Sequence, residues 1–478
     1  MRAENSDTIA AIATGLSSAG IGIVRISGPQ AWAVADRLYL DKEGKHTLPA
    51  FMAGSIHFGY ICDPEGRVVD EVLVSVFRAP HSYTAEDAVE INAHGGVFLL
   101  QKILRLAIEA GARLAEPGEF TKRAFLNGRI DLAQAEAVMD VISAENEAAG
   151  RLAQAQLRGD LSARIEELRG KILTETAYIE SALDDPDHFS LEGYAAHIEA
   201  VLADVLAEAE KLLEKAAEGR SYREGVATAI IGRPNAGKSS LLNRLVGRER
   251  SIVTQVPGTT RDTVEESLRL GNGILRLIDT AGLHDTQDAV EQIGMDRTRE
   301  AIEEAALLLF VIDASQGVTP EDKAIAEIIA PHLAGDKKCI VLWNKADLTD
   351  AVNNNRDGQS AALALFPEQK EAHPPVLVTS METGEGMEAL REEVLRLFHM
   401  GEALPENEVF LANVRHITAL EEACASLRLA REAAQTGVSE DLYTVDLMDA
   451  YAALSRILGQ QVGEDLIEEI FRKFCLGK

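Results

Sequence analysis

The sequence predicts a chain of the α/β and α classes, in which an N-terminal α/β domain, a discontinuous helical domain and an inserted doubly wound α/β domain share 478 residues. Three observations lead to this prediction: short β-rich runs near the N-terminus, two stretches of purely helical pattern, and strands that alternate with helices between those stretches. We expect the segments 1–119, 120–220, 221–395 and 396–478, of which the second and the fourth form one helical domain.

The first segment mixes strand and helix patterns. β-rich runs occur at 21–26, 68–77 and 88–92, and turn signals such as Gly28-Pro29 separate them. Leucine and isoleucine recur at helical spacing over about 99–107, and Gly111 is expected to end that helix. These elements predict a small α/β domain.

The helical segments have a different pattern. Residues 131–183 contain no proline and repeat apolar side chains three or four positions apart, which predicts a long helix that ends at Asp185-Pro186-Asp187. A further helix is expected over about 191–218, and residues 408–478 repeat the same pattern. Because another domain separates the two stretches, the helical domain is expected to be discontinuous.

The inserted segment alternates strands and helices. Short apolar runs at 227–231, 274–279, 307–313, 339–344 and 376–379 are typical of buried parallel strands, and helical patterns lie between them. This order predicts a doubly wound sheet with helices on both faces.

Composition excludes several classes of protein. The formal charge of −30 excludes a generally basic nucleic-acid binder, so contact with a nucleic acid would need a local patch or a partner. The four cysteines form no CxxC pair, which excludes a disulfide scaffold. The N-terminus lacks the pattern of a signal peptide and no apolar run reaches membrane-spanning length, so we expect a cytoplasmic protein with no membrane contact.

The first chemical motif reads GRPNAGKS from Gly232 to Ser239, which fits the P-loop pattern GxxxxGK[ST]. It follows the strand expected at 227–231 and precedes a helix, which is the context that this motif requires. Backbone N–H groups of such a loop bind phosphate oxygens, and Lys238 would reach the β- and γ-phosphates. Ser239 would bind a magnesium ion.

Two further motifs identify the nucleotide as GTP. Asp279 begins DTAG at the end of the expected strand 274–279, where a carboxylate supports magnesium and the Gly282 N–H senses the γ-phosphate. Asn344 begins NKAD, in which the Asp347 carboxylate can accept two N–H donors that guanine offers and adenine lacks. Together with Ser380 in the following loop, these motifs predict a Ras-like P-loop GTPase domain.

Two positions depart from the common pattern. Leu283 stands where a Ras-like enzyme carries its water-orienting glutamine, so another group must orient the attacking water. Met381 stands beside Ser380 where most GTPases have alanine, and this larger side chain is expected to alter nucleotide affinity but not the choice of base.

The motifs together resemble the MnmE/TrmE family of tRNA-modification GTPases. The resemblance covers essentially the whole chain, and it is specific. It rests on GRPNAGKSSLLNRLVGRERSIVTQVPGTTRD, on GIVRISG from Gly22, on SYTAEDAVEINAHGG from Ser82, on the stretch from Arg123 to Ala137, and on the terminal FCLGK.

The resemblance implies a potassium-activated GTPase that acts with the flavoprotein partner MnmG, which carries FAD, on carbon 5 of the wobble uridine of tRNA. It implies a homodimer, with potassium bound by Asn235, Thr254, Val256 and Thr259, magnesium by Ser239 and Thr260, and catalysis by Glu291. The implied GTP-binding set is Asn235, Ala236, Gly237, Lys238, Ser239, Ser240, Thr254, Gln255, Val256, Pro257, Gly258, Thr259, Thr260, Asp279, Thr280, Ala281, Gly282, Asn344, Lys345, Ala346, Asp347 and Ser380.

The resemblance also implies that the N-terminal domain binds a tetrahydrofolate derivative as a one-carbon donor. The matching residues are Arg25, Glu90, Arg129 and Lys478. Cationic side chains suit the glutamyl tail of a folate, and a carboxylate suits the donor edge of a pterin ring. Cys475 is open to two interpretations, a nucleophile or a small buried apolar side chain.

Two alternatives to this function remain. The first is a ribosome-assembly GTPase of the Era or Der kind, although residues 402–478 contain neither a GxxG loop nor a second P-loop. The second is a nucleotide-gated adaptor that binds GTP without turning it over, against which Glu291 and the potassium loop argue.

Overall fold

The computed structural model describes residues 7–249, 266–270, 273–278, 299–334, 337–349, 358, 360–366, 373–398, 400, 408–460, 462–472, 474 and 477. The chain divides into two compact units. The first comprises Met1–Ile142, Ala155–Leu206 and Ala419–Lys478, and the second comprises Ser143–Gln154 and Ala207–Thr418. The division into four domain segments stays a prediction from the sequence.

The first unit contains a seven-stranded sheet with the spatial order β3-β4-β5-β6-β2-β1-β7. Neighbouring strands are antiparallel except β1 and β7, which are parallel. Its strands are β1 (Ile9–Ile12), β2 (Ile21–Ser27), β3 (Tyr39–Asp41), β4 (Ser55–Cys62), β5 (Val68–Phe77), β6 (Ala88–His94) and β7 (Arg113–Leu114). The three β-rich runs expected from the sequence are thus β2, β5 and β6.

The side chains of this sheet alternate between its two faces. Val89 and Ile91 of β6 are fully buried in one core with side chains of α1 (Ala31–Leu38) and α2 (Val97–Glu109). Glu90 lies between them in the strand, so its side chain stands on the opposite face. Glu90 therefore lies on the sheet face that α1 and α2 do not cover.

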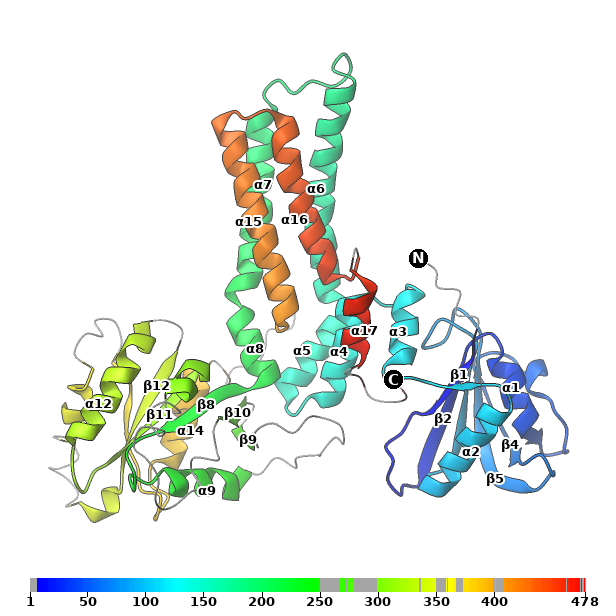
Figure 1. The fold of residues 1–478 in the computed structure, drawn as a ribbon, viewed down its shortest axis with the longest axis horizontal. Coiled ribbons are helices and arrows are strands. Elements are labelled where there is room, and N and C mark those ends of the chain that lie inside the picture. The colour runs from blue at the N-terminus through cyan, green and yellow to red at the C-terminus, as the bar shows by residue number, and fades with distance from the viewer. Residues whose placement is uncertain are drawn as a thin grey trace. The chain divides into compact units, whose positions relative to one another are not determined.

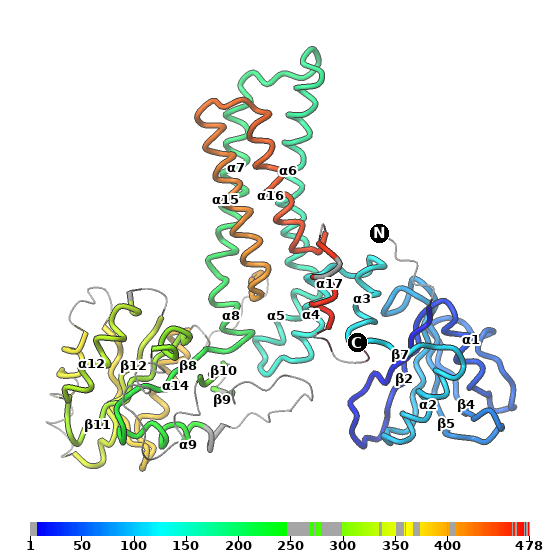
Figure 2. The backbone as a smooth tube through the Cα atoms, in the orientation of Figure 1, coloured from blue at the N-terminus to red at the C-terminus, as the bar shows by residue number. Residues whose placement is uncertain are grey.

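The helices of the first unit bring together distant parts of the chain. Figure 2 shows residues 155–206 and 419–478 lying side by side, and α6 packs along α16. The helices that follow the first sheet in the chain are α3 (Glu119–Leu126), α4 (Leu132–Ser143), α5 (Glu147–Arg158), α6 (Asp160–Asp184), α7 (Tyr194–Glu214) and α8 (Ala216–Glu224). Those nearest the C-terminus are α15 (Val414–Thr436), α16 (Glu440–Ile457) and α17 (Glu464–Arg472). Of these helices, α8 and most of α5 belong to the second unit.

The single long helix expected over residues 131–183 is wrong, because the structure has three helices in that stretch. Gly159 separates α5 from α6, and its φ of 93° is a left-handed conformation that interrupts a right-handed helix. The expected end of this stretch at residues 185–187 is confirmed, because α6 ends at Asp184.

The second unit contains a six-stranded sheet with the spatial order β13-β12-β11-β8-β10-β9. All neighbouring pairs are parallel except β9 and β10. Its strands are β8 (Val226–Ile231), β9 (Glu266–Leu270), β10 (Gly273–Leu277), β11 (Leu307–Asp313), β12 (Lys338–Asn344) and β13 (Val376–Val378). The sequence did not predict β9, which is an antiparallel edge strand.

Helices cover both faces of this sheet. Side chains of α9 (Lys238–Glu249) and α14 (Met387–Leu397) enter one core, and side chains of α12 (Pro320–Ile329) enter the other. Figure 1 shows these helices beside the strands of the sheet. The unit is therefore doubly wound, as predicted. The chain leaves β8 at the point where the strand order reverses, which is where open α/β sheets bind their ligands.

Short 3₁₀ segments complete the description, at Leu48–Ala50, Ala330–Ala334 and Ala346–Leu348. Within the ranges given above, no helix is both long and apolar enough to cross a membrane.

Candidate functional site

The P-loop connects the carboxyl end of β8 to α9. Gly232 has a φ of 152° and Asn235 a φ of 63°, so the chain turns sharply before the helix begins at Lys238. A Cβ atom on Gly237 would lie 2.2 Å from Nδ2 of Asn344, so only glycine fits there. The loop and the first turn of α9 thus form an anion-binding end of a helix.

Lys238 points into this loop. Its Nζ donates to the carbonyl oxygens of Gly232 at 2.6 Å and Arg233 at 2.8 Å. Burial lowers the pKa of the Lys238 ammonium below its usual range. A phosphate beside this group would offset the cost of burying its charge, which is the role expected from the motif.

Asn344, at the end of β12, joins two loops of the site. Its Nδ2 donates to the Ala236 carbonyl at 2.9 Å, and its Oδ1 accepts from the Met381 backbone N–H at 3.3 Å. The side chain is almost fully buried. One residue therefore sets the distance between the phosphate-binding loop and the loop that follows β13.

The base-binding residues lie beside it. Ser380 Oγ donates to Asp347 Oδ1 at 2.5 Å, and Ser380 is fully buried whereas Asp347 is exposed. The hydroxyl holds one carboxylate oxygen, so the carboxylate has a fixed orientation toward a ligand. The site therefore presents an acceptor pair that suits the N–H edge of guanine.

The Met381 side chain lies in the protein core, whereas the sequence led us to expect it beside the base. It is 7% exposed and lies in the core that contains Leu390 and Val394 of α14. Only the backbone of Met381 contacts the site. The expected effect of a larger side chain beside the base is therefore not supported by its position.

Asp313, at the end of β11, was missed by the sequence analysis. Its Oδ2 accepts from Lys345 Nζ at 2.8 Å, and Lys345 has a left-handed backbone with a φ of 62°. Burial would raise the pKa of the Asp313 carboxyl, but hydrogen bonds from Lys345 and Ser315 and the charge of Lys345 outweigh burial and lower it. The signal in the sequence was a carboxylate as the last residue of an apolar strand.

Several predicted residues lie outside the described part of the chain. These are Thr254, Gln255, Val256, Pro257, Gly258, Thr259, Thr260, Asp279, Thr280, Ala281, Gly282, Glu291 and Lys478, and also Cys475. The described members of the implied metal sites are Asn235 in the P-loop and Ser239 in the first turn of α9. The described ranges contain no group of three or more His, Cys, Asp or Glu side chains that could hold a metal.

The three described candidates for folate binding meet in a separate cavity of about 470 Å³ in the first unit. Arg25 of β2 and Glu90 of β6 face each other across the two strands, and Nε and Nη2 of Arg25 lie 2.8 Å from Oε1 of Glu90. Oε2 of Glu90 takes part in neither contact. Arg129 lines the same cavity, although it is 104 residues from Arg25 in the chain.

The Tyr83 ring contacts both arginine side chains of this cavity. The guanidinium carbon lies 5.1 Å from the Tyr83 ring centroid for Arg25 and 4.9 Å for Arg129. The C-terminus approaches as well, since the Gly477 carbonyl accepts from Arg25 Nη1 at 3.4 Å. The cavity combines cations, a carboxylate and an aromatic ring, and its volume suits a small organic anion.

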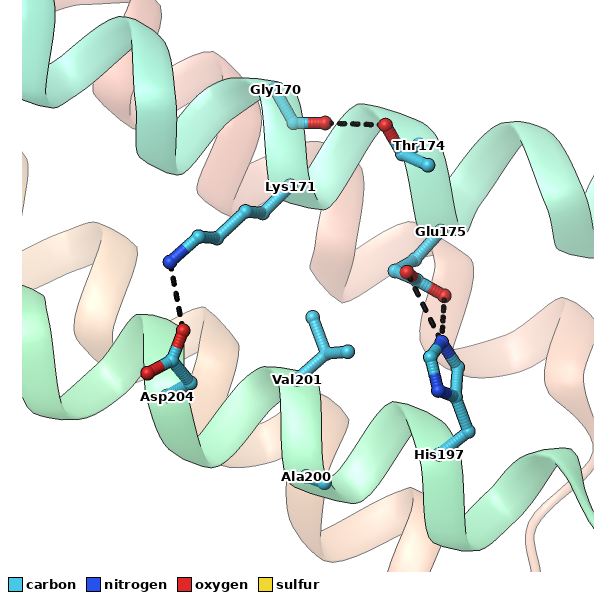
Figure 3. Close-up of a pocket in the computed structure, with 8 residues that line it drawn as sticks. All are labelled: Gly170, Lys171, Thr174, Glu175, His197, Ala200, Val201 and Asp204. Atoms are coloured by element: carbon cyan, nitrogen blue, oxygen red, sulfur yellow. Dashed lines mark hydrogen bonds and ion pairs between the residues drawn. The ribbon is translucent and has the colours of Figure 1, made fainter.

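A second cavity of the same unit, about 600 Å³, lies between α6 and α7. Figure 3 shows four of its polar side chains paired across the two helices, Lys171 with Asp204 at 2.7 Å and Glu175 with His197 at 3.1 Å. These pairs hold the helices together, and we assign no ligand to the cavity.

The doubly wound sheet, the P-loop at its switch point and the guanine-binding loops define a P-loop GTPase, an enzyme that hydrolyses GTP. Residues 132–475 match the family model of the MnmE helical domain, and residues 8–129 match that of the GTP-binding protein TrmE N-terminus. The chain belongs to this MnmE/TrmE family of tRNA modification GTPases.

Relatives match along their whole length. The chain is 45% identical over 473 residues to the tRNA modification GTPase MnmE of Lachnoclostridium phytofermentans, with 99% of this chain and 100% of the relative covered. It is 43% identical over 474 residues to the protein of that name from Bacillus subtilis, with 99% and 100% covered. The family resemblance inferred from the motifs is thereby confirmed.

Proposed function

We propose that the chain is a potassium-activated GTPase that produces GDP and phosphate. Together with the flavoprotein MnmG it takes part in adding a carboxymethylaminomethyl-type group to carbon 5 of the wobble uridine of tRNA. The observation that carries this proposal is the convergence of Lys238, Asn344, Asp347 and Ser380 at one end of the sheet, in a chain related to MnmE proteins over its full length. Full-length relatives of that name favour tRNA modification over the ribosome-assembly alternative. We also propose a cytoplasmic location, because the proposed substrate, tRNA, is found there.

The described residues suit the steps of GTP binding. The P-loop N–H groups and Lys238 would bind the phosphates, and Asp347, oriented by Ser380, would bind the guanine edge. Ser239 and Thr260 would ligate magnesium. Asn235, Thr254, Val256 and Thr259 would hold potassium, which supplies positive charge beside the phosphates where other systems insert an arginine. Glu291 would orient the attacking water.

Potassium is expected to accelerate GTP hydrolysis, whereas sodium at the same ionic strength should not, because the smaller ion binds without closing the loop around it. Asn235→Ala should lose the potassium response and keep nucleotide binding, since Lys238 and the P-loop N–H groups remain. The measurement is steady-state turnover in matched potassium and sodium buffers, with and without the flavoprotein. Asn243→Ala, which changes an exposed asparagine of α9, is the control. Equal rates in the two buffers would refute the potassium assignment. Absence of turnover in both would favour the alternative of a nucleotide-gated adaptor that binds GTP without hydrolysing it.

The cavity at Arg25, Glu90 and Arg129 is the proposed site for a tetrahydrofolate derivative, with Lys478 as a further ligand from the C-terminus. Oε2 of Glu90 can accept from the donor edge of a pterin ring, and Arg129 can pair with a glutamyl carboxylate. FAD would come only with the partner.

The face of the N-terminal sheet that carries Arg25 and Glu90 supports the proposed homodimer. It carries the exposed side chains of Ile56 and Phe58 on β4 and Leu73 on β5, and Phe58 and Leu73 are paired across the strands. The helices α1 and α2 cover the other face. A second copy that covered this apolar face would also approach the cavity, because Arg25 and Glu90 stand on it.

Replacing Arg25 by alanine is expected to weaken binding of 5-formyl-tetrahydrofolate by at least about tenfold, because a charge-assisted contact is lost and Glu90 loses its partner. Isothermal titration of the full-length protein measures this. Arg67→Ala is the matched control, since Arg67 is an exposed arginine of the same sheet domain, paired with Asp63. If wild type and Arg25→Ala bind the folate equally, Arg25 is not part of the site.

A further inference from the structure

We propose that Arg244 of α9 is a positioning residue for guanine selectivity, because it hydrogen-bonds to the backbone of the base-binding loop, residues 380–385. The inference rests on the proposed base site at Asp347 and Ser380. Arg244 lies six residues after Lys238 on the same helix, so one helix would carry both a phosphate ligand and a support for the base loop.

The contact is between one guanidinium and two consecutive peptide groups. Nη1 of Arg244 donates to the Met381 carbonyl at 2.7 Å and to the Glu382 carbonyl at 3.2 Å. Gly384 makes this approach possible, because a Cβ atom there would lie 2.2 Å from Nη2 of Arg244. The loop is thus shaped around the arginine.

Met381 is held on both sides of its backbone. Its N–H donates to Asn344 Oδ1 at 3.3 Å, its carbonyl accepts from Arg244, and its side chain is buried in the core. Three contacts therefore fix the residue that directly follows Ser380. The helix that supplies Arg244 is itself anchored by Leu241, Leu242 and Leu245 in the same core.

The contacts of Arg244 would affect base binding through Ser380, which lies in the same turn and orients Asp347. The Ser380 backbone carbonyl accepts from the Gly384 N–H at 2.8 Å, its N–H donates to the Glu385 carbonyl at 3.1 Å, and its hydroxyl orients Asp347. If the carbonyls of Met381 and Glu382 lose their donor, the turn is free to shift, and the carboxylate loses its fixed orientation. The loss should fall on the contact that Asp347 makes, not on the phosphates.

The test compares GDP with inosine diphosphate, whose base lacks the exocyclic amino group that Asp347 would bind. Arg244→Met removes the donors and keeps an unbranched aliphatic side chain. We expect the GDP-to-IDP affinity ratio to fall by about three- to tenfold, the value of roughly one hydrogen bond. In a titration of the GTP concentration, kcat should stay unchanged while KM rises. Both nucleotides are titrated calorimetrically against the same preparation, so a misfolded fraction changes the stoichiometry and not the ratio.

Arg244→Lys keeps a cation and N–H donors, so its GDP-to-IDP affinity ratio should lie between those of wild type and Arg244→Met. If Arg244→Met does not fold, Arg244→Lys is compared with wild type instead, and its ratio should be the lower of the two. Arg396→Met is the control, because Arg396 is an exposed arginine of α14 paired with Glu393. A wild-type ratio in Arg244→Met, or an equal loss of affinity for both nucleotides, overturns the role of Arg244. A wild-type protein that does not prefer GDP overturns the base site itself.

Discussion

Replacing Glu291 by alanine is expected to slow GTP turnover by at least about two orders of magnitude, while GTP affinity persists. We also expect the GTPase domains (residues 221–395) of the proposed homodimer to keep associating in the presence of potassium. Leu283 cannot orient the attacking water, so a polar group elsewhere in residues 283–294 must do so. The resemblance to the family implies Glu291 for that role. Water-orienting or general-base assistance contributes roughly 10²–10⁴ in rate.

The measurement is single-turnover hydrolysis at saturating GTP, together with the dissociation constant for a non-hydrolysable GTP analogue. The control is Glu300→Ala, which removes an exposed glutamate of the described part of the same unit. Hydrolysis by Glu291→Ala at a rate near that of wild type would refute the role, and His284 and Asp288 would be the next residues to test. Loss of analogue binding in this variant would mean that Glu291 supports the nucleotide site rather than the water.

The second large effect is expected from Asp347→Asn, which should weaken GTP binding by about 2–4 kcal/mol and improve binding of xanthosine triphosphate. Ser380 Oγ donates to Asp347 Oδ1, so an asparagine there would offer its oxygen to Ser380 and its NH₂ group to the ligand. Xanthine has a carbonyl where guanine has an amino group, so it can accept from that amide.

Competition titrations with GTP and xanthosine triphosphate measure the switch. Asp187→Asn is the control, since Asp187 is an exposed aspartate of the turn after α6. Unchanged GTP affinity in Asp347→Asn would show that the carboxylate does not bind the base.

Much of the candidate site could be predicted because its motifs are local. The P-loop, the NKAD sequence and Ser380 each lie at or just after the end of a strand, and the expected strands became β8, β12 and β13 within about a residue. The break at Gly159 and the edge strand β9 were missed, since a single glycine and a short half-polar strand are weak signals beside a long helical or apolar pattern.

The sequence by itself determined that a P-loop and a guanine-binding motif stand at strand ends, because carboxyl ends of parallel strands meet at one edge whatever the details of packing. Only the tertiary structure decided which side chains join these loops. Asn344 reaches Ala236 and Arg244 reaches Met381, more than 100 residues away in each case, because β8, β11 and β12 lie side by side. The meeting of Arg25, Glu90 and Arg129 depends likewise on the register of β2 against β6 and on the loop that carries Tyr83. Such contacts join residues with no shared local pattern, so no period or motif in the sequence encodes them.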